Sequence, residues 1–210
     1  MKKFLLCVVF GFLMIACATG VAKSDEKMAV IMRECEYTSD GVMFIIYEDC
    51  ILKRLAHYCL NEKDISICEN LANRVSDAEK SCINNEVWGC HKLGVLYAKG
   101  YGVEQNFFKA FEFYKKACDL NLPNSCYNLA ILYKDGQGTK QNFTNAINLY
   151  EKACNANHAK SCNNLGFLYD NGQGIKQNKS MAKKYFGKAC DLGEQMGCDN
   201  YKMLNEKGVK

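Results

Sequence analysis

Eight cysteines fall in a lattice that restricts the fold of this chain more than any other feature of its sequence. They form four pairs whose members are eight positions apart, and each pair follows the last by 36 positions: Cys82/Cys90, Cys118/Cys126, Cys154/Cys162 and Cys190/Cys198. A fixed period of this size is typical of stacked repeats, in which each unit buries its apolar face against its neighbours. The sequence therefore predicts an array of 36-residue units.

The lattice is interpreted as one disulfide per repeat, because thiols of an exported chain pair in an oxidising compartment. Zinc is the alternative, but it favours closer Cys-x2–4-Cys spacing with converging ligands. The three histidines, His57, His91 and His158, do not recur in register with the lattice. We therefore expect no metal site and no cofactor.

Four further cysteines lie off the lattice and outside the leader described below. Cys59 and Cys68 are nine positions apart, close to the lattice spacing, and are predicted to pair. By elimination, Cys35 is then predicted to pair with Cys50.

Residues 1–22 have the features of a secretory leader, with two lysines followed by an apolar run from Phe4 to Ala16 that is too short to span a membrane. Two endings are open. Cleavage beside the small residues would release a soluble secreted or periplasmic protein, whereas Met14-Ile15-Ala16-Cys17 approximates a lipoprotein box and would anchor the protein to a membrane through a lipid on Cys17. We favour soluble export, because methionine stands where the box usually has leucine.

The charge of the chain argues against a nucleic-acid partner. The whole sequence has 27 basic and 23 acidic side chains, and removal of the leader deletes two lysines and no acid. The lysines are spread along the chain beside Glu and Asp, which is typical of solvated helix faces rather than of a dense basic surface.

Each unit has the pattern of a helical hairpin. Leucines and a tyrosine at i, i+3 and i+4 after the second cysteine predict a first helix, called helix A, and an alanine–aromatic–alanine pattern predicts a second, helix B. Between them, Gly-x-Gly is expected to end helix A and the asparagine of Gln-Asn to cap helix B. These residues are Leu93, Leu96, Tyr97, Gly100, Asn106, Ala110, Tyr114 and Ala117 in the first full unit, and they recur 36 and 72 positions later with Phe186 as the last aromatic.

A small residue also recurs inside helix A, at Gly94, Ala130 and Gly166, which predicts close packing against a neighbouring helix. The expected organisation is a leader at 1–22, an N-terminal segment at 23–42, a divergent helical hairpin at 43–81, repeats at 82–117, 118–153 and 154–189, and a capping helix at 190–210.

The motifs Leu-Gly-x-Leu-Tyr, Gly-x-Gly, Gln-Asn and Lys-Ala-Cys resemble those of the Sel1-like repeat family, which is TPR-like, and the Cys-x7-Cys of every unit resembles its Helicobacter cysteine-rich subfamily. The resemblance covers residues 82–198 and extends to about residue 43. It implies an all-α, right-handed solenoid of αα-hairpins with a concave groove. It also implies one of two functions. The first is an interaction scaffold, and the second is a penicillin-binding protein or β-lactamase.

The enzyme hypothesis is supported by one sequence motif inside the repeat array. Ser180-Met181-Ala182-Lys183 matches the Ser-x-x-Lys pattern of serine β-lactamases, and Ser24-x-x-Lys27 matches it near the mature N-terminus. Ser-Asp-Asn and Lys-Thr-Gly, which line the substrate site of those enzymes, are missing from the sequence. No catalytic constellation is visible, so Ser180 and Lys183 are candidates from one tetrapeptide alone.

The residues therefore favour a recognition scaffold that acts as a monomer. Its ligand is expected to be a peptide, a protein or a cell-wall-like molecule, held mainly by helices A; the alternative ligand is a β-lactam. Trp88 and His91 are unique in the array, and two placements are open for them: exposure in the groove or burial under the first hairpin.

Overall fold

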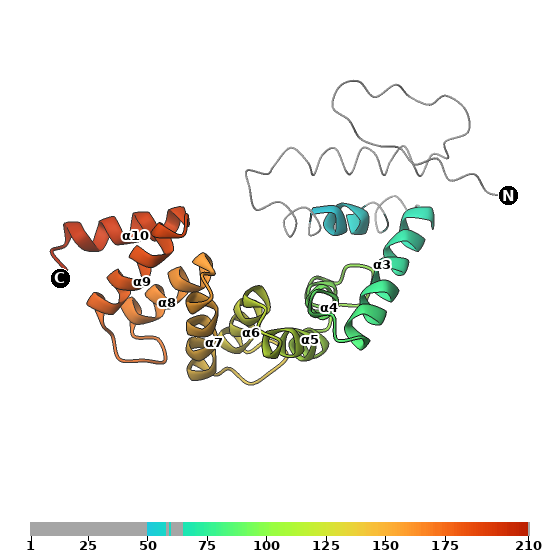
Figure 1. The fold of residues 1–210 in the computed structure, drawn as a ribbon, viewed down its shortest axis with the longest axis horizontal. Helices are drawn as coiled ribbons and strands as arrows, with labels where there is room; N and C mark the ends of the chain where they lie inside the picture. Colours follow the sequence, from blue (N-terminus) through green and yellow to red (C-terminus); the bar gives the residue numbers. More distant parts are fainter. Residues whose placement is uncertain (1–49, 58, 60–64, 210) are drawn as a thin grey trace, which may run out of the picture. The chain divides into compact units, whose positions relative to one another are not determined.

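The computed structural model describes residues 50–57, 59 and 65–209 (Figure 1). The chain divides into two compact units, Met1–Arg54 and Leu55–Lys210. In the first unit, residues 50–54 are helical. The leader, the two possible endings near Cys17, Ser24 with Lys27, and Cys35 lie outside the described residues, so the Cys35–Cys50 pairing stays a prediction.

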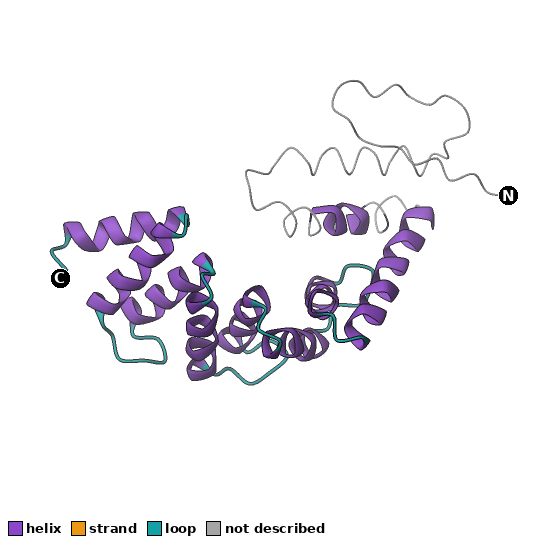
Figure 2. Ribbon diagram, viewed as in Figure 1, coloured by secondary structure: helices purple, strands orange, loops and turns teal. Residues whose placement is uncertain are grey.

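All regular structure in the described ranges is helical (Figure 2). The order is α3 (Ile65–Ile83), α4 (Val87–Lys99), α5 (Phe107–Asp119), α6 (Pro123–Asp135), α7 (Phe143–Asn155), α8 (Ala159–Asn171), α9 (Lys179–Asp191) and α10 (Gln195–Glu206). Helices A are α4, α6, α8 and α10, and helices B are α5, α7 and α9. Each helix packs mainly against the helices before and after it in the chain, which confirms the predicted array of helical hairpins.

In the turn inside each hairpin, helix A ends and helix B begins at the predicted residues. Helix A stops at a glycine in the left-handed conformation, with φ of 72°, 68° and 66° at Gly100, Gly136 and Gly172. The side chains of Asn106, Asn142 and Asn178 accept the backbone N–H three residues further on, at 3.0, 2.9 and 3.0 Å. This bond satisfies one of the N–H groups that a helix start leaves unpaired, so both predicted roles are confirmed.

The glutamine before each capping asparagine has a role that the sequence did not reveal. Its Nε2 donates to a carbonyl in the last turn of helix A, at 2.6–2.8 Å: Gln105 to Ala98, Gln141 to Lys134 and Gln177 to Asp170. The Gln-Asn pair therefore joins the end of helix A to the start of helix B.

The small residue inside helix A makes room for the aromatic ring of helix B. A Cβ atom on Gly94 would lie 2.4 Å from Cδ1 of Tyr114, and one on Gly166 would lie 2.6 Å from Cδ1 of Phe186. Both rings are buried. The two helices of these hairpins therefore approach more closely than a larger side chain would allow.

One disulfide joins the end of each helix B, or of α3, to the first turns of the next helix A. The structure contains Cys82–Cys90, Cys118–Cys126, Cys154–Cys162 and Cys190–Cys198, together with Cys59–Cys68. The first three of these lattice disulfides are buried, whereas Cys190–Cys198 is half-buried. Each bridge ties one hairpin to the next.

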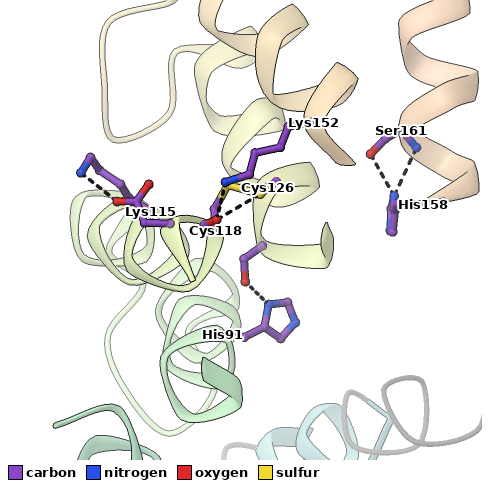
Figure 3. Close-up of a disulfide and its surroundings, with 9 residues drawn as sticks. His91, Lys115, Cys118, Cys126, Lys152, His158 and Ser161 are labelled. Atoms are coloured by element: carbon purple, nitrogen blue, oxygen red, sulfur yellow. Dashed lines mark hydrogen bonds and ion pairs between the residues drawn. A yellow bond between two sulfur atoms is a disulfide. The ribbon is translucent and has the colours of Figure 1, made fainter. Parts of the chain in front are cut away.

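A lysine from the following helix B supports two of these junctions. Lys116 Nζ donates to the carbonyl of Cys82 at 2.8 Å. Lys152 Nζ donates to that of Cys118 at the same distance of 2.8 Å (Figure 3). Each carbonyl belongs to the last turn of a helix, where a cation is stabilised by the helix dipole. The lysine of the Lys-Ala-Cys motif is thus a contact between repeats.

Candidate ligand-binding face

One row of positions on every helix A is only partly covered by the neighbouring helices. It carries the residues two, five and nine positions after the second lattice cysteine, and we call this set the helix-A stripe. Its members are Lys92, Val95 and Lys99 on α4, Asn128, Ile131 and Asp135 on α6, Asn164, Phe167 and Asn171 on α8, and Asn200 and Met203 on α10. All of them are half-buried or exposed, whereas the leucines three and six positions after the cysteine are buried in α4, α6 and α8.

The stripe has an apolar centre with polar borders. Its middle position is Val95, Ile131, Phe167 and Met203 in successive helices, and asparagine precedes it by three residues in all but the first. A fully apolar centre and a polar rim are the usual anatomy of a protein interface. Amide side chains both donate and accept, so this surface can hydrogen-bond to the main chain of a peptide while the apolar row contacts its side chains.

The residue that directly follows the second cysteine lies beside the stripe and links consecutive helices A. Asn200 Nδ2 on α10 donates to Asn163 Oδ1 on α8 at 3.2 Å. The corresponding residue of α6, Tyr127, packs against His158 at the start of α8 with ring centroids 4.7 Å apart, and against Tyr150 of α7. Burial raises the pKa of Tyr127, while the Asn164 side chain lowers it in part. The stripe therefore rests on contacts that fix neighbouring helices A.

The structure separates the two unique residues of the first repeat. Trp88 is 49% exposed, whereas His91 is 6% exposed and lies edge-on to the Trp88 ring at 5.8 Å. His91 Nδ1 is 2.7 Å from Ser125 Oγ on α6 (Figure 3). Burial lowers the pKa of His91 to about 4, so the ring is neutral at pH 7. His91 is thus a contact between repeats, and only Trp88 offers a surface to a ligand.

A second histidine forms a similar pair with a serine. His158 is the N-cap of α8, with its Nδ1 atom 2.9 Å from Ser161 Oγ (Figure 3). Ser125 and Ser161 occupy the same position of successive repeats and are both fully buried. A buried hydroxyl is out of reach of a substrate, so these Ser–His pairs do not form a nucleophilic site. Sequence reasoning missed them because each histidine comes from a different position of the repeat.

The sequence candidates for catalysis lie at the start of α9. Ser180 is an exposed residue of its first turn. Lys183 Nζ donates to Asn205 Oδ1 at 2.9 Å and to the carbonyl of Val209 at 2.5 Å, and it lies over the Tyr201 ring. These contacts direct the lysine toward the C-terminal segment, where it holds α10 and the residues after it against α9.

Two other kinds of site are missing from the described residues. Among them, no group of three or more His, Cys, Asp or Glu side chains is placed to hold a metal ion. Within the same ranges, no helix has the length and apolar character needed to cross a membrane. The expectations of no metal and no cofactor stay predictions.

Comparison with known proteins identifies the family to which this chain belongs. The Sel1 repeat family model matches residues 89–122, 123–158 and 159–194, just over half of the chain. These matched units begin at or near the start of a helix A, whereas the predicted repeats begin at the first cysteine of each lattice pair. No curated protein gives a significant match.

Three solved structures are similar to this chain. A Sel1 repeat protein from Oxalobacter formigenes has 24% identity and a TM-score of 0.60, with 75% of this chain and 62% of that one covered. A protective antigen of uropathogenic Escherichia coli with an SLR fold has 21% identity and a TM-score of 0.62, with 75% and 37% covered. Helicobacter pylori cysteine rich protein B has 32% identity and a TM-score of 0.51, with 63% and 95% covered. The match thus spans less than two thirds of the first two proteins.

Fold and surface together define an all-α repeat scaffold whose hairpins are joined by disulfides. The chain belongs to the Sel1 repeat family. Its disulfide-bonded repeats make it similar to the cysteine-rich Helicobacter protein in particular.

Proposed function

We propose that this protein is an exported scaffold that binds an extended peptide segment of a partner protein along the helix-A stripe. One observation carries the proposal: a half-exposed apolar side chain recurs once per helix A, at Val95, Ile131 and Phe167, and an amide borders it on α6 and α8. Asparagine lowers helix propensity by several tenths of a kcal/mol relative to alanine. Asn164 and Asn200 have contacts within the fold, but Asn128 stands at a half-exposed helical position despite this cost, which favours a role in binding a ligand.

The position-by-position pattern of the repeats supports recognition. Side chains that hold the hairpins together are the same or similar in each unit, as in the glycine stops, the asparagine caps and the cysteines. Side chains of the stripe differ, with Val95, Ile131, Phe167 and Met203 at one position and Lys99, Asp135 and Asn171 at another. A surface that changes along a constant scaffold can distinguish the successive residues of a peptide.

Export is part of the proposal. The disulfides of the described repeats require an oxidising compartment to form and persist. A leader at residues 1–22, expected from the sequence, would deliver the chain to it. A secreted or periplasmic location is our proposal, with a lipid anchor at Cys17 as the alternative.

The binding proposal is tested with the oxidised full chain and a phage library of random 12-residue peptides. Enriched peptides are titrated against the wild type, Ile131→Asp and Asn128→Ala on the stripe, and Phe108→Asp on α5, whose side chain is 73% exposed. We expect Ile131→Asp to weaken binding at least tenfold, Asn128→Ala to weaken it less, and Phe108→Asp to leave it unchanged. Asn128→Ala removes a half-exposed amide without charge or added bulk, which keeps the test valid if Ile131→Asp disturbs folding.

The proposal fails if no peptide is enriched over panning on the reduced protein, or if enriched peptides bind both stripe variants as tightly as the wild type. It also fails if Phe108→Asp is the variant that loses binding, because the ligand would then lie on helix B.

A further inference from the structure

Two histidines are built into the contacts between consecutive helices A, one on each side of α6. His91 on α4 reaches Ser125 on α6, 34 positions further along the chain, with Nδ1 and Oγ 2.7 Å apart. His158, at the start of α8, packs its ring against Tyr127 of α6 with centroids 4.7 Å apart. Both contacts therefore hold α6 to the helix A beside it.

The contact of His158 requires a neutral ring. The backbone N–H of Ser161 donates to His158 Nδ1 at 3.2 Å, and Ser161 Oγ lies 2.9 Å from the same atom. A nitrogen that accepts an N–H must have a free lone pair, so the ring carries its proton on Nε2. A proton on Nδ1 would point at a donor, and the ring would have to leave the cap. The Ser161 N–H keeps its bond to the His158 carbonyl, so the helix start survives but the ring contact with Tyr127 does not.

The buried site of His91 disfavours the charged, imidazolium form of its ring. The ring lies between Trp88 of its own helix, Tyr114 of α5 at 5.8 Å and Ser125 of α6, and Ser125 is fully buried. An imidazolium in such a site loses its hydration and gains no anionic partner.

Titratable groups around the two rings do not offset this cost. Tyr114 faces His91, and Tyr127 and Lys160 are the corresponding groups at His158. Among the described residues, no carboxylate is identified that raises the pKa of either histidine; Lys160 lowers that of His158 further, after the larger effect of burial.

We propose that the array has an acid-sensitive joint on each side of α6, where protonation of His91 and His158 breaks the contacts with Ser125 and Tyr127 and loosens α6 from α4 and α8. The direction follows from linkage. The folded state holds both pKa values near 4, below the ordinary 6.5, so the stabilising contribution is complete above pH 6.5 and is lost as the pH falls toward 4. This regulation is a property of the scaffold and does not depend on the ligand proposed above. Because Ile131 lies on α6, acid would also disturb the stripe.

Urea unfolding of the oxidised full chain at pH 7.5 and pH 5.0 tests the joint. The two pKa values predict a fall in the folding equilibrium constant of up to about 30-fold per histidine at pH 5.0, and less for the half-buried His158. His158→Asn keeps an N-cap acceptor that does not titrate, but it loses the ring contact with Tyr127. It should therefore be less stable than the wild type at pH 7.5, while the fall in its folding equilibrium constant between the two pH values should be several-fold smaller. His57→Gln replaces an exposed histidine away from α6 and serves as the control substitution.

A second readout does not depend on how the variants fold. Imidazole NMR signals of the wild type should show that His91 and His158 titrate below pH 5. The proposal is overturned if His91 and His158 titrate near pH 6.5, or if the wild type and His158→Asn lose the same stability between the two pH values.

Discussion

Replacing Cys118 and Cys126 together by alanine removes one disulfide from the middle of the array, and its cost can be worked out from the structure. The bridge closes a loop with a sequence separation of 8. The chain-entropy model assigns about 2.5 kcal/mol to a loop of this length at 25 °C. Both cysteines are buried at 1% exposure, so the lost sulfur atoms add about 1 kcal/mol through poorer packing. We expect the free energy of unfolding to fall by about 3–4 kcal/mol in total.

The matched control is the double replacement of Cys190 and Cys198. This bridge has the same sequence separation of 8, but it is half-buried and holds only the last described helix, α10. In a linear array each repeat is stabilised by its neighbours, so a weakened central junction affects both sides of the molecule while a weakened end frees one helix.

Urea unfolding followed by far-UV circular dichroism distinguishes the two variants. The central variant should lower the midpoint of the main transition, and it should broaden or split that transition because the two halves lose cooperativity. The terminal variant should lose a small early fraction of helical signal and keep the main midpoint within experimental error. Equal effects of the two variants, or a central loss below about 1 kcal/mol, would show that the bridges do not couple the repeats as described.

Three other substitutions test single features of the structure. Asn142→Ala should cost about 1 kcal/mol of stability in urea unfolding, because the N-cap bond of α7 is lost; an unchanged midpoint would contradict this. Gly166→Ala should destabilise by about 1–2 kcal/mol despite alanine's better helix propensity, since the new Cβ meets the buried Phe186 ring, and a gain in thermal midpoint would refute it. Ser180→Ala should leave any hydrolysis of a chromogenic cephalosporin unchanged, because Lys183 donates to the C-terminal segment; loss of turnover would identify Ser180 as a nucleophile.

The local structure of each hairpin was predictable because it depends on residues close in sequence. A glycine in the left-handed conformation and an asparagine that caps the helix three residues ahead act within one turn of chain. Their recurrence at 36-residue spacing, as in Gly136 and Asn142, therefore predicted where helix A ends and helix B begins.

Contacts between repeats could not be predicted in the same way. The lysine of Lys-Ala-Cys was recognised as a motif, yet its bond to a carbonyl 34 positions earlier depends on how one hairpin stacks on the last. The same holds for His91, whose burial under α5 and α6 is set by the second repeat rather than by its own sequence surroundings.

The candidate binding face was located only in part. Periodicity identified helix A as amphipathic and placed Leu93, Leu96 and Tyr97 on its packed side. Which of the other residues face away from helix B depends on the close contact of Gly94 with Tyr114, which fixes the rotation of the helix. Val95 and Ile131 form one half-exposed row as a result of that rotation.

The central claim, that the helix-A stripe is the recognition surface, is tested most directly by methyl NMR of the oxidised protein with a peptide enriched from the random library. Binding should shift the methyl signals of Val95 and Ile131 on the stripe and leave that of Ile83, exposed at the end of α3, unchanged. Shifts at Ile83 with none at Val95 and Ile131 would contradict the account, because the peptide would then bind away from the stripe.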